Sequence, residues 1–323
     1  MSRFKVVVVS LGYESYDTER AILKRIGAEL ILAPRDCLTE DEVIAAAKDA
    51  DAVLVREAPM GARVINALQR CKAIVRYGVG VDNIDLQRAR ERRIYVANIP
   101  GYGTEEVSDH TVALLLACVR NLVTRDRNLR QGKFELDIQD TVFRTTGKVL
   151  GLVGYGRIGK AFHRKWKGFL PQRVLVFDPL VADQEITGQG GEKTDLDALF
   201  AHSDYISLHA PLTPQTRHLI NGTSLQNMKP TAILINTARG ELIDEKALVK
   251  ALTEKRILAA GLDVFEREPL PSDHPLLSLP NVILTGHVSW YSKDAVKELQ
   301  TRGAQEVFRV LSGEPPQQWL NRW

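Results

Sequence analysis

Short apolar runs alternate with segments of helical periodicity along most of this chain. In the helical segments, apolar residues recur every three or four positions, as on one face of an amphipathic helix. Unbroken apolar runs are typical of strands buried on both faces of a parallel sheet. The clearest predicted strands are residues 6–9, 52–55, 73–76, 173–177, 205–208, 259–262 and 282–284. The alternation predicts an α/β fold with parallel sheets.

The alternation predicts two doubly wound domains. A Pro-Gly-Tyr-Gly segment at 100–103 interrupts the pattern and is typical of a hinge. The last helix, predicted over 293–311, has no strand after it, so we expect it to fold back onto the first domain. We therefore predict a flavodoxin-like substrate domain formed by residues 1–102 and 291–323, a Rossmann cofactor domain formed by residues 103–290, and a cleft between them.

A long helix is predicted directly after the segment at 100–103, from about Glu105 to Gln131. Its middle, Val112 to Val119, is apolar nearly all round, so it must be buried on several faces. A core position alone explains this pattern, and packing against the same helix of a second subunit explains it at least as well.

A glycine-rich turn carries the main chemical signal. The apolar run 149–153 leads directly into the sequence Gly-x-Gly-x-x-Gly, which comprises Gly154, Tyr155, Gly156, Arg157, Ile158 and Gly159. In a strand–turn–helix context, the first glycine allows a tight turn, the second lets the backbone approach a diphosphate, and the third lets the helix pack closely on the strand. The next predicted strand ends at Asp178, where a carboxylate can accept hydrogen bonds from a ribose. Together these features predict a site for NAD rather than NADP.

The predicted strands end in polar residues that share one edge of the sheet. In an open parallel sheet, ligands bind at the carboxyl ends of the strands. The residues found there are Gly78–Gly80, Gly154–Gly159, Asp178, His209–Pro211, Thr237–Arg239, Asp263 and Gly286–His287. Each of them has an ordinary structural explanation, such as a packed loop or a capped turn, but their common location favours a functional site.

The chemistry of a nicotinamide reaction suggests roles for some of these residues. Reduction of a carbonyl moves a hydride to carbon and requires a proton for oxygen, and an imidazole suits that task near neutral pH. His287, at the end of the last strand, is the candidate acid/base, and a neighbouring carboxylate would stabilise its charged form. Glu266 and Glu268 compete for that role, and their spacing does not separate them. Arg239 is the candidate cation for an anionic substrate, because guanidinium binds carboxylate in a bidentate manner.

Composition narrows the classes of function. The chain is 44% hydrophobic and 26% charged with a net charge of +3, which does not favour nucleic acid or a membrane surface as a partner. No apolar stretch approaches the length of a membrane span. The three cysteines are scattered without metal-ligand spacing, so we expect no metal site, and reduced thiols in a cytoplasmic protein.

Several motifs in one order resemble the D-isomer-specific 2-hydroxyacid dehydrogenases over nearly the whole chain. The motifs are Tyr77–Asp85, Glu105–His110, the glycine turn with Asp178-Pro179, His209–Thr213, Ile235–Gly240, Gly261–Glu266 and Gly286-His287. The resemblance implies His287 as acid/base, Glu268 as its partner and Arg239 as the substrate-orienting cation. It also implies that the backbone of Val79 and Gly80 holds the substrate carboxylate, and that the enzyme is a homodimer built on the long helix. The cofactor contacts it implies, besides the glycine turn, are Asp178, Pro179, His209, Ala210, Pro211, Thr216, Thr237, Ala238, Arg239, Asp263 and His287.

The segment after His287 differs from that of many members of the family. Here Val288-Ser289-Trp290-Tyr291-Ser292 follows, which is similar to the branch of the C-terminal-binding proteins, NAD-binding corepressors with dehydrogenase architecture. Trp290 is expected either to border the substrate pocket and favour a bulky or apolar 2-keto acid, or only to pack between the domains. Two functions follow: an NADH-dependent reductase of a 2-keto acid to a D-2-hydroxy acid, which the sequence favours, or an NAD(H)-sensing interaction protein with little turnover.

Overall fold

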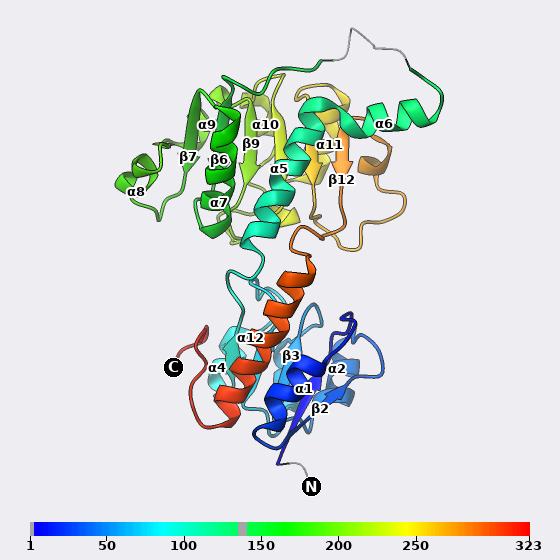
Figure 1. Cartoon of the computed structure of the whole chain (residues 1–323), viewed down its shortest axis with the longest axis vertical. Helices are drawn as coiled ribbons and strands as arrows, with labels where there is room; N and C mark the ends of the chain where they lie inside the picture. Colours follow the sequence, from blue (N-terminus) through cyan, green and yellow to red (C-terminus); the bar gives the residue numbers. More distant parts are fainter. Residues whose placement is uncertain (1–2, 135–140) are drawn as a thin grey trace. The chain divides into compact units, whose positions relative to one another are not determined.

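The computed structural model describes residues 3–134 and 141–323, which fold into two compact units (Figure 1). One unit comprises Met1–Gly103 together with Tyr291–Trp323, and the other comprises Thr104–Trp290. Each unit contains one parallel sheet, which confirms the predicted fold class. None of the helices in the described ranges is long and apolar enough to cross a membrane.

The first unit has a five-stranded sheet in the order β2-β1-β3-β4-β5. Its strands are β1 (Phe4–Val8), β2 (Ala28–Leu32), β3 (Ala52–Val55), β4 (Ala73–Arg76) and β5 (Tyr95–Ala97). Its helices are α1 (Asp17–Lys24), α2 (Glu40–Ala47), α3 (Ala62–Ala67), α4 (Leu86–Glu91) and α12 (Lys293–Leu311). All strand pairs are parallel. Parallel pairing requires crossover connections, and the segments with helical periodicity between the strands supply them.

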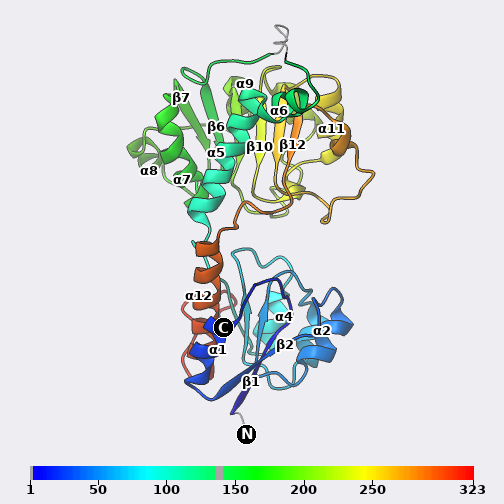
Figure 2. The same cartoon turned by 45° about the vertical axis from the view of Figure 1, so that its right-hand side comes forward.

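Helix α12 returns to the sheet of the first unit and packs beside α1 (Figure 2). A Cβ on Gly303 of α12 would lie 2.8 Å from the ring of Tyr77, so glycine permits the close approach of this helix to β4. Between the two helices, the buried carboxylate of Glu19 accepts hydrogen bonds from Tyr77 Oη (2.7 Å) and Gln300 Nε2 (3.0 Å). Burial raises the pKa of Glu19, although both hydrogen bonds oppose the shift.

The second unit has a seven-stranded sheet in the order β12-β11-β10-β9-β6-β7-β8. Its strands are β6 (Val149–Val153), β7 (Arg173–Phe177), β8 (Glu192–Lys193), β9 (Tyr205–Leu208), β10 (Ile233–Asn236), β11 (Ala259–Leu262) and β12 (Val282–Leu284). Its α-helices are α5 (Thr104–Arg120), α6 (Leu122–Arg130), α7 (Arg157–Trp166), α8 (Asp183–Gly188), α9 (Leu196–His202), α10 (Gly222–Asn227) and α11 (Glu245–Thr253). Short 3₁₀ turns lie at η1 (Lys167–Phe169), η2 (Gly240–Leu242) and η3 (Pro275–Ser278). The strand order reverses direction next to β6, which places the topological switch point at the glycine turn.

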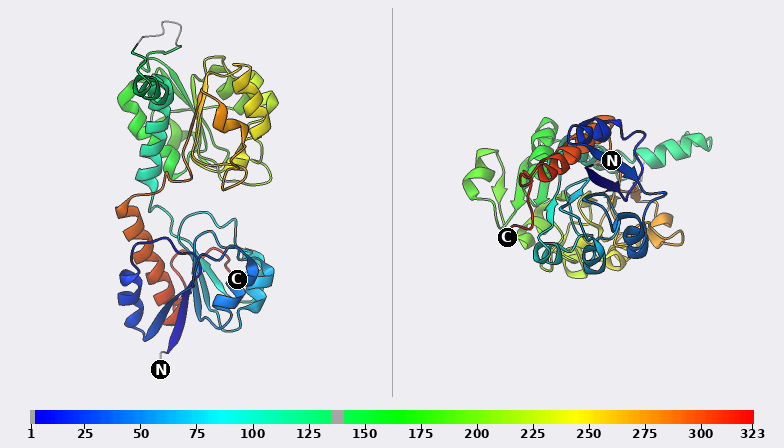
Figure 3. Two further views of the ribbon diagram at one scale, coloured as in Figure 1. Left: turned by 90° about the vertical axis from the view of Figure 1, so that its right-hand side faces the viewer. Right: turned by 90° about the horizontal axis from the view of Figure 1, so that it is seen from below.

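The predicted single long helix is wrong, because two helices occupy its length. Asn121 adopts the left-handed conformation (φ 54°, ψ 34°) and separates α5 from α6. Asparagine tolerates this conformation better than most residues, so the chain breaks there at little cost. Helix α6 then extends away from the sheet (Figure 3) and buries none of its residues, and its Leu122 and Leu129 are 53% and 56% exposed.

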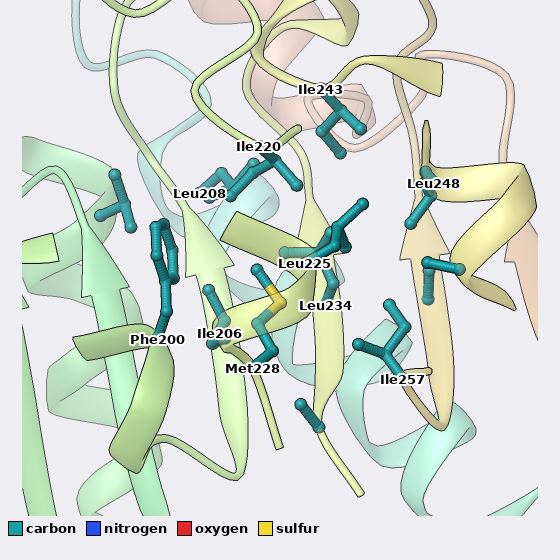
Figure 4. Close-up of a cluster of buried hydrophobic side chains, with 14 of the residues drawn as sticks. Phe200, Ile206, Leu208, Ile220, Leu225, Met228, Leu234, Ile243, Leu248 and Ile257 are labelled. Atoms are coloured by element: carbon teal, nitrogen blue, oxygen red, sulfur yellow. The ribbon is translucent and has the colours of Figure 1, made fainter. Parts of the chain in front are cut away.

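Two apolar cores cover the two faces of the seven-stranded sheet. On one face, side chains from α9, α10 and α11 meet the sheet, among them Phe200, Leu225 and Leu248 (Figure 4). On the other face, α5 and α7 contribute residues such as Leu115 and Trp166. The strands between these layers are buried on both sides, which explains why they are unbroken apolar runs in the sequence.

Candidate active site

The glycine turn after β6 has the local geometry that a diphosphate site requires. Gly154 has φ +95°, and a Cβ there would lie 2.6 Å from Ala210 N, so only glycine fits between this turn and the loop after β9. A Cβ on Gly159 would lie 2.5 Å from Gly154 O, which explains the close packing of α7 on the turn. Gly156, the residue before α7, would meet nothing within 4 Å. The turn therefore leaves open space at the amino end of a helix, where an anion is stabilised.

Asp178 lies at the carboxyl end of β7 and is tied to the glycine turn. Its Oδ2 accepts a hydrogen bond from Tyr155 N (2.7 Å), and its Oδ1 accepts one from Leu180 N (2.9 Å). Tyr155 is itself anchored, because its buried hydroxyl lies 2.7 Å from His163 Nδ1. The carboxylate is thus held beside the turn, at the position from which a ribose is recognised in dinucleotide-binding folds.

The loop after β9 closes the other side of the glycine turn. Burial lowers the pKa of His209 to about 3, so this imidazole is neutral near pH 7, and its Nε2 lies 3.0 Å from Ser207 Oγ. Thr216 donates to Pro211 O (2.7 Å) and accepts from Thr213 N (2.8 Å), which stabilises the rest of the loop. His209 is therefore suited to packing against the turn and not to proton transfer.

The Arg239 turn follows β10 and is fixed by a buried asparagine. Asn236 donates to Arg239 O (2.8 Å) and accepts from Ala238 N (3.0 Å), while Arg239 Nη1 donates to Ala238 O (2.7 Å). A Cβ on Gly240 would lie 1.8 Å from Phe265 C, so the glycine lets this turn contact the loop after β11 directly. Asn236 lies inside the motif Ile235–Gly240, but no role was predicted for it; an amide at a strand end, just before a turn, was the available signal.

His287 and Glu268 form a close pair on neighbouring loops. His287 Nδ1 lies 2.6 Å from Glu268 Oε2, and both side chains are partly exposed. Burial opposes ionisation of Glu268, but the hydrogen bond and charge of His287, with a further bond from Phe265 N (3.0 Å), hold the pKa of that carboxyl below its usual value. A charged carboxylate next to Nδ1 orients the ring, so Nε2 is the ring nitrogen that does not face Glu268.

Glu266 is engaged on the other side of the same loop. Its Oε1 lies 2.8 Å from His218 Nε2, and its backbone N donates to Glu245 Oε1 (2.7 Å). Burial raises the pKa of Glu245, whose other oxygen lies 3.2 Å from His274 Nε2. Of the two carboxylates that spacing could not separate, the geometry therefore places Glu268 against His287.

Asp263 organises the loop that carries His287. It is fully buried at the end of β11, and its carboxylate accepts from Thr285 Oγ1 (2.6 Å), Val288 N (3.0 Å) and Ser289 N (2.9 Å). The next residue, Trp290, donates from Nε1 to His287 O (3.1 Å). Asp263 thus holds the backbone after His287 and the Thr285 side chain before it.

Val79 and Gly80 belong to the first unit, in the loop after β4. Gly78 has φ +149°, which favours glycine, and its carbonyl accepts from Ile99 N (2.8 Å). Asn98 Nδ2 donates to Val79 O (2.6 Å), so the loop is held by its carbonyl oxygens. Within the described residues no group of His, Cys, Asp and Glu is arranged to hold a metal ion.

The glycine turn and the Asp178 carboxylate beside it have the form of a dinucleotide site. The His287–Glu268 pair lies near the Arg239 turn. Together these features are typical of a dinucleotide-dependent oxidoreductase. The chain belongs to the D-isomer-specific 2-hydroxyacid dehydrogenase family, because residues 112–289 match the family described as "D-isomer specific 2-hydroxyacid dehydrogenase, NAD binding domain". That match lies inside the second unit and assigns NAD as the cofactor.

Relatives and solved structures agree with this assignment. The chain is 40% identical over 284 residues to a glyoxylate reductase of Korarchaeum cryptofilum, covering 87% of this chain and 85% of that protein. It is 38% identical over 278 residues to a hydroxypyruvate reductase of Thermotoga maritima, covering 85% and 89%. A D-lactate dehydrogenase of Aquifex aeolicus, solved in complex with NAD and lactic acid, superposes with a TM-score of 0.86 at 29% identity and 96% coverage of both chains.

Proposed function

We propose that this protein reduces a 2-keto acid to a D-2-hydroxy acid with NADH, and catalyses the reverse oxidation with NAD. The 2.6 Å contact between His287 Nδ1 and Glu268 Oε2 is the observation that carries the proposal, because it prepares one histidine nitrogen for proton transfer. The Arg239 turn, which contacts the loop between β11 and Glu268, supports it.

Different residues of this chain carry out different parts of the proposed reaction. NADH, when bound along the glycine turn and Asp178, supplies the hydride that is transferred to the keto carbon. His287 then donates its Nε2 proton to the keto oxygen, and Glu268 stabilises the charged imidazole and fixes its orientation. Arg239 holds the keto acid in a bidentate manner.

A substrate panel tests the proposal. Glyoxylate, hydroxypyruvate, pyruvate and bulkier 2-keto acids are incubated with the protein and NADH, and loss of the reduced cofactor's absorbance is followed. The names of the two relatives favour the small members of this panel. We expect turnover of at least one keto acid and a D-configured product; absence of turnover with every acid, at protein concentrations that bind NADH, would contradict the proposal.

That negative outcome would support the second candidate, an NAD(H)-sensing protein similar to the C-terminal-binding corepressors. The observation behind it is the segment Trp290-Tyr291-Ser292 after His287.

The resemblance to the dehydrogenase family also implies a homodimer built on the segment that α5 and α6 occupy. We propose a homodimer that covers α6, since no residue of that helix is buried within the chain and its leucines lie open.

Asp178 is expected to set the cofactor preference. Its carboxylate would repel the 2′-phosphate of NADPH, so the wild-type protein should show a lower KM for NADH than for NADPH. In Asp178→Ser this preference should narrow or reverse, because the repulsion is removed. The measurement is kcat/KM with each cofactor at saturating keto acid. Asp183→Ser, on the exposed first turn of α8, is the matched control; a wild-type preference for NADPH would refute the role.

Trp290 is expected to select among keto acids by size. Its indole is fixed by the bond to His287 O, so the side chain has a defined place next to the acid/base loop. Trp290→Ala should improve kcat/KM for bulky 2-keto acids relative to glyoxylate, as a space is opened. Trp290→Phe, which keeps most of the volume, should change the ratio much less. An unchanged profile across the panel in both variants would leave Trp290 with a packing role alone.

A further inference from the structure

Two consecutive residues of α5 reach two different loops of the candidate site. His110 Nε2 lies 3.0 Å from Thr285 Oγ1, just before His287, and Thr111 Oγ1 lies 3.0 Å from Thr237 Oγ1, just before Arg239. The loops follow β12 and β10, which are separated in the sheet by β11. Helix α5 packs across this part of the sheet. One helical turn therefore contacts the supports of both residues proposed to act on the substrate.

The hydrogen-bond directions on the His110 side can be assigned. Thr285 has one hydroxyl proton and donates it to Asp263 Oδ1 (2.6 Å), because a carboxylate can only accept. Thr285 Oγ1 must then accept from His110, which places the ring proton on Nε2. The chain of bonds continues from Asp263 to Val288 N, and the backbone carbonyl of Asp263 accepts from His287 N (2.7 Å).

The backbone conformation of His287 explains why its loop needs this support. Its φ of +55° lies in the left-handed region, which is costly for a residue with a Cβ. Such a conformation persists only where the surroundings fix it, and it is found mainly at functional sites. The bonds that converge on Asp263 supply that constraint, and His110 is their link to a long helix.

The directions on the Thr111 side follow in the same way. Thr111 Oγ1 donates to Val107 O (2.7 Å) in the preceding turn of α5, so it accepts the hydroxyl proton of Thr237. Both threonines are buried, and Thr237 precedes the turn that Asn236 holds around Arg239. The Arg239 turn is thereby attached to the same helix as the His287 loop.

We propose that His110 and Thr111 are positioning residues, which together form a clamp on α5 that sets the placement of His287 relative to Arg239. Neither side chain is required to touch substrate. Proton transfer and substrate binding depend on the relative placement of these two groups, and a displacement of 1 Å can lower a rate about 100-fold. The kinetic part of the clamp rests on the proposed function, and its structural part does not.

The test compares paired variants that remove or keep each hydrogen bond. His110→Leu removes the donor, whereas His110→Gln keeps an N–H close to the position of Nε2. Thr111→Val removes the hydroxyl with little change of shape, whereas Thr111→Ser keeps it. Thr253→Val is the matched control, since its hydroxyl also donates within a helix of the same unit, to Val249 O.

Two readouts are used, and one of them needs no turnover. Backbone amide hydrogen exchange should accelerate at residues 285–289 in His110→Leu and at residues 237–240 in Thr111→Val, with the Gln, Ser and control variants close to wild type. In steady-state kinetics, kcat should fall about 10- to 100-fold in His110→Leu. The KM for the keto acid should rise about tenfold in Thr111→Val.

The outcomes separate the clamp from the proposed function. Unchanged exchange in both loops would overturn the clamp, and so would accelerated exchange without a change of kinetics in an active protein. Equal losses in His110→Gln and His110→Leu would also overturn it, because the hydrogen bond would then not be the cause. If the wild-type protein reduces no keto acid, the proposed function fails, and the exchange data alone decide whether His110 and Thr111 hold the two loops.

Discussion

Replacing His287 by alanine is expected to lower kcat for keto-acid reduction by about 10²- to 10⁴-fold, the usual contribution of a positioned general acid. The imidazole lies on a loop that is already held by Asp263, so the substitution removes the proton donor without removing the support of its backbone. NADH affinity should stay close to wild type, because the glycine turn and Asp178 lie on other strands. Steady-state kinetics and NADH fluorescence titration measure the two quantities.

Other histidines of the second unit provide the controls. His202 is exposed at the end of α9, and His202→Ala should leave kcat unchanged. His209 lies nearer the glycine turn, but burial lowers its pKa to about 3, so it cannot substitute as a proton donor near neutrality. Wild-type turnover by His287→Ala would remove this residue from the proton-transfer step.

The carboxylate pair shows where sequence patterns stop being informative. Glu266 and Glu268 are two residues apart on an irregular loop, where no periodicity assigns a side chain to a direction. The family resemblance favoured Glu268, and the structure supplies the physical reason. Glu266 is turned toward His218 and Glu245, and this leaves Glu268 facing His287.

The strands were the most predictable elements, for a reason that is local. Runs such as 52–55 and 259–262 have the bounds of β3 and β11, because burial on both faces makes every residue of a strand apolar. The end of α5 was not predictable in this way. The apolar and polar pattern continues through Asn121 into α6, and the left-handed conformation of one residue breaks the helix. The contacts of His110 and Thr111 were equally hidden, since both residues lie in what reads as an ordinary helical segment.

The cofactor loop and the substrate loops also differ in how they are stabilised. The glycine turn is determined by steric fit, as Gly154 and Gly159 leave no space for a side chain. Steric requirements of this kind appear in sequence as glycines at fixed spacing, so the sequence alone predicts the cofactor turn. The loops of Arg239 and His287 are instead held by buried hydrogen bonds from Asn236 and Asp263. Polar residues of these types occur in many roles, so their function becomes visible only in three dimensions.

Arg239 is the second position at which a large effect is expected. A guanidinium can form two parallel charge-assisted hydrogen bonds with a keto acid, each contributing about 1.5–3 kcal/mol. Arg239→Gln keeps a polar side chain but removes the charge, so kcat/KM for the keto acid should fall about 10²- to 10⁴-fold. Arg239→Lys should recover only part of the loss, since an ammonium group restores the charge without the bidentate geometry.

The pattern of the kinetic constants distinguishes substrate binding from damage to the fold. The KM for the keto acid should rise in both Arg239 variants while the thermal midpoint Tm remains near wild type, because Asn236 still holds the backbone of the turn. Arg217→Gln is the matched control, since Arg217 is a half-exposed arginine of the same unit that lies 3.8 Å from Glu241. If Arg239→Gln and Arg217→Gln had the same modest effect, the substrate would have to be oriented by another cation. If the lysine variant matched wild type, charge alone would suffice, and the bidentate contact would not be part of the mechanism.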